Sequence, residues 1–208
     1  MNLILSDLLL SIIVQYHFPK FKVNYEWKDG SDFSKVSAYI ADKNGASVNL
    51  KNGTVTCNDE AMHYSGSSYG CNEKFKSDKD YNFLVKLPDS TTYEGSVKGA
   101  RKIKGINWPK SLNKNKAEKL RWLSGKDRNI KVELRVQNDK NSWETVHTYH
   151  VGSDNSYFLE LPQMDFPDKM NGKAEIIISN STKGNISGDF GGGSAESSTI
   201  YTKSLTIK

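Results

Sequence analysis

The amino-acid sequence predicts an all-β protein that contains two consecutive antiparallel β-sandwich domains. Short segments of alternating apolar and polar residues recur along the chain, as in strands that bury one face. Asn-Gly and Asp-Gly pairs separate several of these segments, and such pairs favour tight hairpins. The chain has 208 residues, which exceeds the usual size of one small sandwich and suits two domains of about 100 residues each.

In the first half, the clearest strand pattern lies at residues 21–27, where apolar and polar side chains alternate throughout. Asp29-Gly30 then predicts a turn. The apolar run at residues 3–14 has no basic residue before it and no small-residue cleavage site after it, so both a first strand and a degenerate signal sequence fit; we favour the strand. The other strands expected in this half are 36–40, 48–50, 55–57, 81–87 and 92–97.

The strand pattern restarts after residue 101, so we expect one domain over residues 1–101 and a second over residues 102–208. Each half contains a strand with a tryptophan, Trp27 or Trp122, and we expect both rings in a core. Each half also has an aromatic strand that closes on Leu-Pro. The strands expected in the second half are 106–109, 119–122, 130–136, 143–151, 157–161, 174–179 and 200–207.

Cys57 and Cys71 are the only cysteines, and the thirteen residues between them are rich in glycine, serine and tyrosine, as in an exposed loop. A disulfide between them would close a loop of about 15 residues and add roughly 3 kcal/mol of stability in the chain-entropy model. Such a bond persists in an oxidising compartment and therefore favours export. The alternatives are two free thiols or an incomplete metal site; we favour the disulfide.

The net charge is +5 and the isoelectric point is about 9.0. The densest basic segment runs from Lys98 to Arg121 and coincides with the expected connection between the domains. Proteins that bind single-stranded nucleic acid interleave basic residues with stacking aromatic rings, and only Trp108 lies in this segment. We therefore favour a solvated linker over a nucleic-acid patch and predict no nucleic-acid partner.

Sequence motifs of common enzymes are absent from the chain. It has no Gly-x-Ser-x-Gly, no His-Glu-x-x-His and no nucleotide-binding glycine motif. His147 and His150 are three positions apart on an expected strand, so their side chains face opposite sides and do not chelate one metal ion. We predict no catalytic residue, no metal and no cofactor, and hence a protein that is not an enzyme. No segment has the length and apolar character of a transmembrane helix.

Residues 119–207 carry Leu120-Arg121-Trp122, Val132-Glu133-Leu134 and an aromatic strand at 157–162. In this pattern they resemble the immunoglobulin-like and fibronectin type III-like modules of microbial surface proteins. The first half is similar to the immunoglobulin-like modules of bacterial surface lipoproteins and adhesins. The resemblance implies two tandem immunoglobulin-like domains in a secreted or cell-surface protein of the outer envelope, with any lipid anchor supplied by residues outside this sequence. The close spacing of the two cysteines differs from the inter-sheet disulfide of antibody domains.

These observations predict a non-enzymatic exported or surface protein that binds a protein or a glycan through loops of its sandwiches, in an adhesive or envelope role. Rigid sandwiches commonly present binding residues on loops. The candidate contact residues are Tyr64 and Tyr69 in the cysteine-flanked segment and Trp143 between polar neighbours. The two alternatives are a carbohydrate-binding accessory module of an enzyme system and a purely structural spacer.

Overall fold

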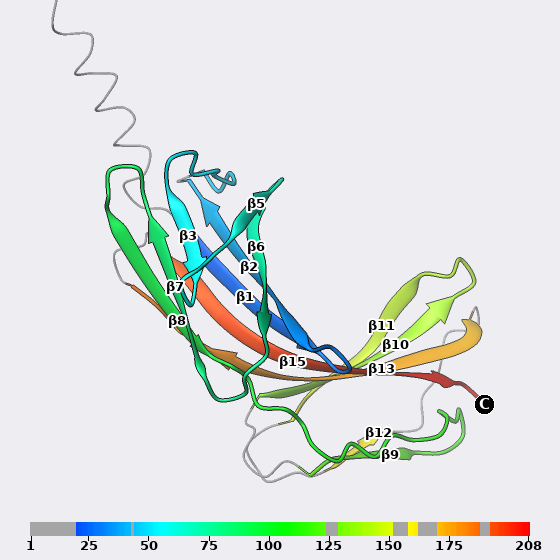
Figure 1. Cartoon of the computed structure of the whole chain (residues 1–208). Coiled ribbons are helices and arrows are strands. Elements are labelled where there is room, and N and C mark those ends of the chain that lie inside the picture. The colour runs from blue at the N-terminus through cyan, green and yellow to red at the C-terminus, as the bar shows by residue number, and fades with distance from the viewer. Residues whose placement is uncertain (1–19, 43, 124–128, 152–157, 162–169, 188–191) are drawn as a thin grey trace, which may run out of the picture. The chain divides into compact units, whose positions relative to one another are not determined.

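A computed structural model describes residues 20–42, 44–123, 129–151, 158–161, 170–187 and 192–208. All secondary-structure elements within these ranges are β-strands, which confirms the all-β prediction (Figure 1). The tandem immunoglobulin-like arrangement remains a prediction. The strands are β1 (Lys20–Lys28), β2 (Phe33–Ala41), β3 (Thr54–Cys57), β4 (Glu60–Ala61), β5 (His63–Ser65), β6 (Ser68–Lys74), β7 (Asp80–Lys86), β8 (Thr92–Lys98), β9 (Glu118–Arg121), β10 (Ile130–Asn138), β11 (Trp143–Val151), β12 (Phe158–Leu161), β13 (Met170–Lys183), β14 (Asn185–Ile186) and β15 (Gly193–Thr206).

The chain divides into two compact units that are built from interleaved segments. Among the described residues, unit 1 comprises those up to Trp27, Ser31–Gly99 and Thr182–Ser197. Unit 2 comprises Lys28–Gly30, Ala100–Ser181 and Ser198–Lys208. The sequence placed the domain boundary near residue 102, and the chain passes from unit 1 to unit 2 between Gly99 and Ala100. Thr182–Ser197, in the expected second domain, belongs to unit 1. The long strands β13 and β15 therefore contribute residues to both units.

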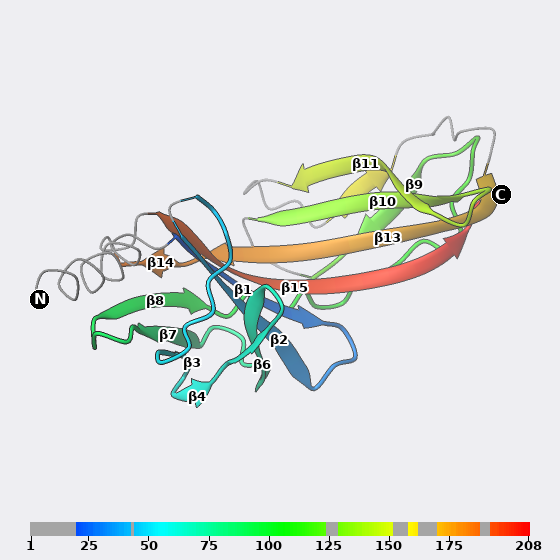
Figure 2. The same ribbon diagram turned by 90° about the horizontal axis from the view of Figure 1, so that it is seen from above.

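Unit 1 contains two layers of strands with an apolar core between them. One layer has β15, β1, β2, β6 and β5 as successive neighbours, and the other has the order β14-β8-β7-β3-β4 (Figures 1 and 2). Strand β1 pairs with β2 in antiparallel register from Lys20↔Ala41 to Trp27↔Ser34. The alternation at residues 21–27 follows from this pairing, because Phe21, Val23, Tyr25 and Trp27 all point into the interior.

Unit 2 contains the neighbouring strands β11, β10, β13 and β15 together with a ribbon formed by β9 and β12. Strand β10 pairs with β13 so that Val132 lies opposite Ile178 and Leu134 opposite Ile176, and all four side chains are buried. The prediction that Trp27 and Trp122 occupy cores is confirmed, since they are 3% and 2% exposed.

The basic segment after residue 98 is not the solvated linker that the sequence suggested. Its lysines and arginines are exposed, but Ala100, Ile103 and Leu112 are buried in unit 2. The segment packs against unit 2 because an apolar residue occurs every few positions and its side chain is buried there. The long basic side chains between these residues extend into water. The expected strand at 106–109 is reduced to an isolated bridge between Asn107 and Arg121.

The segment between the two cysteines is not an exposed loop either. It contains β4, β5 and the first part of β6. Asn58 and Asp59 both have positive φ angles, of 49° and 68°, which is the geometry of a tight type I′ hairpin turn between β3 and β4. Tyr69 is only 5% exposed, so its expected exposure is wrong. The apolar run at 3–14 lies outside the described residues.

Candidate functional site

The outer face of the β14-β8-β7-β3-β4 sheet carries a row of polar side chains. Strand β7 turns alternate residues inward, so Asn82 and Leu84 point outward between buried neighbours. Strand β8 does the same and presents Glu94 and Ser96. The antiparallel register places Asn82 opposite Ser96 and Leu84 opposite Glu94. These four residues form one continuous surface across the two central strands.

Two local structures form the margins of this surface. At one margin β14 pairs with β8, with Asn185 opposite Ser96, and the Ser187 N–H donates to the carbonyl oxygen of Glu94 at 2.9 Å. At the other margin is the β3–β4 turn. There the Asn58 N–H donates to the Asn82 carbonyl at 2.8 Å, and the Asn58 Oδ1 accepts from the Asn82 N–H at 3.0 Å. Both margins are therefore tied to the central strands by backbone hydrogen bonds.

Between these margins lies an open groove of about 800 Å³, which we call the sheet groove. Its described lining combines amides, hydroxyls and carboxylates with the half-buried Leu84, and it contains no lysine or arginine. Such groups supply both hydrogen-bond donors and acceptors. The polar residues that line the groove are Thr56, Asn58, Asp59, Asn82, Glu94, Ser96, Asn185 and Ser187.

The sequence did not single out any residue of the sheet groove. Each polar lining residue of β3, β7 and β8 occupies an outward position of an alternating strand, where a polar side chain is the ordinary choice. The only local signal was the Asn-Asp pair at 58–59, which is typical of a hairpin turn. The lateral register of four strands brings these residues together, and the sequence does not encode that register in any short motif.

The structure distributes the predicted contact residues rather than gathering them. Tyr69 lies in the core of unit 1, where its hydroxyl accepts the Leu50 N–H at 2.5 Å. Tyr64 is half-buried, stacks edge-on against Tyr69 with ring centroids 5.1 Å apart, and donates its hydroxyl to the Gly66 carbonyl at 2.9 Å. Trp143, in unit 2, is 41% exposed at the start of β11. Ligand contact by these three residues remains a prediction.

Cys57 and Cys71 are both free thiols, so the predicted disulfide is not formed in the structure. They nevertheless pack in the same apolar core of unit 1 and come from different sheets, Cys57 from β3 and Cys71 from β6. A hydrogen bond between the two thiols raises the pKa of Cys57 and lowers the pKa of Cys71, and burial adds to the increase at Cys57. Burial also raises the pKa of the nearby Glu73 carboxyl.

No three His, Cys, Asp or Glu side chains in the described part of the chain converge as they would around a metal ion. His147 stacks on Tyr149 with ring centroids 5.9 Å apart. His147 pairs across from the buried Leu134, whereas His150 pairs across from Lys131, so the two imidazoles occupy opposite faces of β11. This arrangement follows the expected alternation of the strand.

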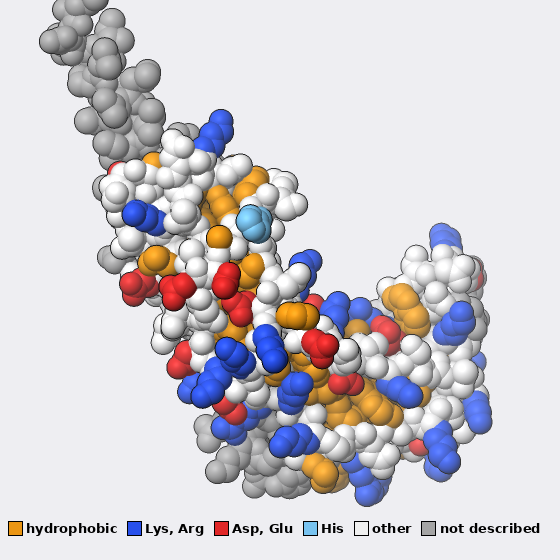
Figure 3. All heavy atoms as spheres, viewed as in Figure 1, with side chains coloured by type: hydrophobic (Ala, Val, Ile, Leu, Met, Phe, Trp, Pro, Cys, Tyr) orange, Lys and Arg blue, Asp and Glu red, His pale blue; other side chains and the backbone are white. Residues whose placement is uncertain are grey.

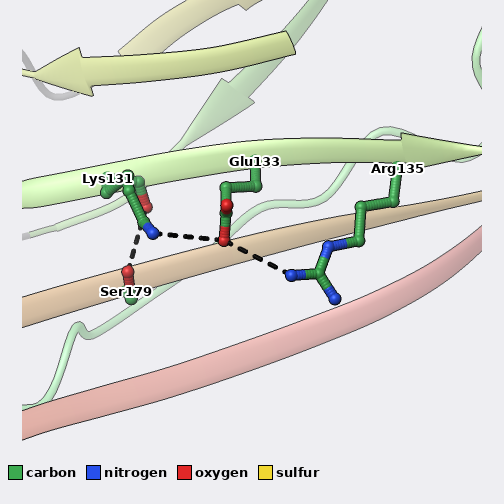
Figure 4. A network of polar contacts seen from close by, with 4 residues as sticks. All are labelled: Lys131, Glu133, Arg135 and Ser179. Carbon is green, nitrogen blue, oxygen red and sulfur yellow. Dashed lines mark hydrogen bonds and ion pairs between the residues drawn. The ribbon is translucent and has the colours of Figure 1, made fainter. Parts of the chain in front are cut away.

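The basic residues do not form one uniform patch on the face shown in Figure 3, where acidic side chains are interspersed among them. A close example lies on β10 in unit 2. The Glu133 carboxylate sits between Lys131, at 3.3 Å, and Arg135, at 3.8 Å, and the Ser179 hydroxyl donates to the Lys131 carbonyl (Figure 4). The two cations are thus partly neutralised within their own strand.

The described residues include no helix that is long and apolar enough to cross a membrane. Comparison of the chain with protein-family models and with curated proteins finds no match.

Proposed function

We propose that the chain is a non-enzymatic binding protein of the cell exterior, and that it holds a neutral glycan in the sheet groove. The observation that carries this proposal is the composition of the groove. Its described lining offers three asparagines, two acids and three hydroxyl residues around Leu84, and no basic side chain. This moves the expected contact surface from the sandwich loops to a sheet face.

The chemistry of the lining favours a glycan without negative charge. Sugar hydroxyls both donate and accept hydrogen bonds, and asparagine amides and carboxylates match them from a fixed backbone. Asp59 and Glu94 would repel sulfated or uronic-acid chains, in spite of the positive net charge of the protein. Leu84 offers an apolar contact for the C–H face of a sugar ring. An open groove, rather than an enclosed cavity, suits a segment of a longer chain.

The exported location is supported by the resemblance to surface modules and by the two adjacent cysteines, which would be able to pair in an oxidising compartment. A role as an adhesin or as a surface lipoprotein would follow from such a location. The location is tested by fractionating cells that produce the untagged protein; recovery with cytosolic markers alone would contradict it.

The binding proposal is tested with a neutral-oligosaccharide array, followed by titration calorimetry on the sugars retained. Asn82→Ala and Glu94→Ala remove groups on the two central strands. Asn24→Ala, an exposed asparagine on β1 in the same unit, is the matched control. Each groove variant should weaken binding several-fold, and their combination by about tenfold, because a lost hydrogen bond costs about 0.5–1.5 kcal/mol.

Two results would overturn the proposal. If the array retains no neutral sugar, the glycan assignment fails, and the spacer or protein-binding roles take its place. If Asn24→Ala weakens binding as much as Asn82→Ala does, the ligand occupies another surface.

A protein partner is the second candidate, and β11 favours it. In the order of the described strands β11 is at the end of its sheet, and Trp143 is exposed at its start. Such an edge is able to accept a strand from another protein. Loss of binding to an envelope-protein extract in Trp143→Ala, with binding retained in Asn24→Ala, would support this role.

A further inference from the structure

The cysteine pair lies beside a second groove of unit 1, at the open edge of the sandwich. This cysteine groove has a volume of about 650 Å³, and its lining includes Cys71 but not Cys57. Strand β5 pairs with β6 only as far as His63↔Gly70, so Cys71 is the first residue of β6 beyond the end of β5. On its other side β6 is covered by β2, with Val36 opposite Cys71. The Cys71 side chain is consequently half-buried and reachable from the groove.

Cys57 occupies a different environment. It pairs with Phe83 of β7 on one side and with Glu60 of β4 on the other, and its side chain is completely buried. Cys57 belongs to the apolar core between the two sheets, and Cys71 packs against this core from the opposite sheet. One sulfur of the pair is therefore accessible and the other is buried directly behind it. Only two sulfur ligands meet here, and no third metal-binding group of the described residues joins them.

We propose that Cys71 and Cys57 form a thiol–disulfide exchange site whose substrate is a low-molecular-weight disulfide. Cys71, as the thiolate, attacks one sulfur of the substrate RSSR; a Cys71–S–SR bond forms, and RS⁻ leaves with the electron pair and takes up a proton. The Cys57 thiol then loses its proton and attacks the Cys71 sulfur, which forms the Cys57–Cys71 bond and expels the second RSH into the groove. Two protein thiols are oxidised and one disulfide is reduced to two thiols.

The surroundings of the pair support this order of events. The hydrogen bond from Cys57 stabilises the Cys71 thiolate, so the accessible sulfur is also the more acidic one. Glu60 and Glu73 oppose this through their negative charge, and the charge of Glu73, on β6 with Cys71, acts on both thiols. The charged and titratable residues that line the groove are Lys35, Glu60, His63 and Glu73. With neutral histidine their charges sum to minus one, so a cationic disulfide is favoured over an anionic one.

The test uses the full chain and cystamine, a cationic disulfide, under anaerobic conditions with acid quenching and peptide mapping by mass spectrometry. The wild-type protein should acquire the Cys57–Cys71 disulfide and release two cysteamines. Cys57→Ala should stop at the mixed disulfide on Cys71 and release one cysteamine. Cys71→Ala should keep Cys57 as a free thiol. Modification of Cys57 in Cys71→Ala at the wild-type rate, or a stable mixed disulfide in the wild type, would overturn the proposal.

A second measurement needs no variant, because substitution of the buried Cys57 can impair folding. Limiting maleimide on the native wild-type chain should label Cys71 at least about tenfold faster than Cys57, since thiolate character and access both control the rate. In concentrated urea the two rates should become equal. Equal labelling of the folded chain, or a difference that persists in urea, would refute the structural basis of the site. None of these results depends on the sheet groove, so failure of the glycan proposal is a separate outcome.

Discussion

Gly184 offers the sharpest test of how the sheet groove is held together. A β-carbon added at this position would lie 2.1 Å from the carbonyl oxygen of Ser96 and 2.8 Å from the Cα of Val97. Both contacts are with the backbone of β8, so no change of rotamer relieves them. Gly184 also donates its N–H to the Ala195 carbonyl at 2.8 Å, which fixes its distance from β15. Gly184→Ala must therefore push β14 away from β8.

The expected cost follows from two opposing effects. Forcing a methyl group into a tightly packed position costs about 1–3 kcal/mol. Replacing glycine by alanine also reduces the entropy of the unfolded chain, which stabilises the fold by about 0.4–1 kcal/mol. The middle values of these two ranges give a net loss of about 1.3 kcal/mol. The unfolding midpoint should then fall by roughly 3–5 °C, at about 2–4 °C per kcal/mol for a chain of this size.

Gly70→Ala is the matched control, because Gly70, on β6, also belongs to unit 1 and its added β-carbon would meet only the Val36 carbonyl, at an ordinary 3.6 Å. Calorimetry should show the midpoint of Gly70→Ala at or slightly above that of the wild type. Glycan binding should weaken in Gly184→Ala, because Asn185 and Ile186 line the sheet groove. A Gly184→Ala midpoint equal to or above that of Gly70→Ala would refute the packing argument.

Three further predictions concern the cores and the thiols. Oxidation to the Cys57–Cys71 disulfide should stabilise the protein by about 3 kcal/mol, seen as a higher urea midpoint that reductant reverses; coincident curves would contradict it. Because the pKa of Cys71 is lowered, its alkylation rate should stay high at a pH where an ordinary thiol no longer reacts, and should fall only as the pH drops through that lowered pKa. In Cys57→Ala, which lacks the hydrogen bond from Cys57, the rate should fall at a higher pH. Trp122→Ala should cost about 3–5 kcal/mol, whereas Trp143→Ala should stay within about 0.5 kcal/mol in the same melts.

Strands with one buried face could be predicted from the sequence because their signal is local. The expected strands at 21–27 and 81–87 coincide with β1 and β7, and the apolar residues of each point inward except Leu84, which faces the sheet groove. The alternation arises from burial of one face, so it records which side of a strand is covered. The alternation does not indicate which strand pairs with which. The order of the strands within each sheet therefore could not be predicted from the sequence.

The long strands β13 and β15 show where this signal ends. The sequence predicted strands at 174–179 and 200–207, but the strands span Met170–Lys183 and Gly193–Thr206. Their additional residues are mostly small and polar, and some are buried: Thr199 and Asn180 both donate to the Arg101 carbonyl, at 2.9 and 3.1 Å. A polar residue can be buried when its hydrogen bonds are satisfied, and it then occupies an inward position without an apolar side chain. The apolar–polar alternation in the sequence therefore ends before the strand does.

The surroundings of the cysteine pair also depend on strand pairing that the sequence does not show. The spacing of Cys57 and Cys71 predicted a disulfide that closes a surface loop, whereas the structure has two free thiols on strands of different sheets. In the structure the chain passes from one sheet to the other between them, so the same bond would join β3 to β6. Loop length sets the entropy of closure, which is unchanged by this correction. What changes is reactivity, because an inward position on β3, between β4 and β7 in the sheet, buries one sulfur while the end of β5 leaves the other open. The asymmetry on which exchange chemistry depends is thus a property of the strand pairing.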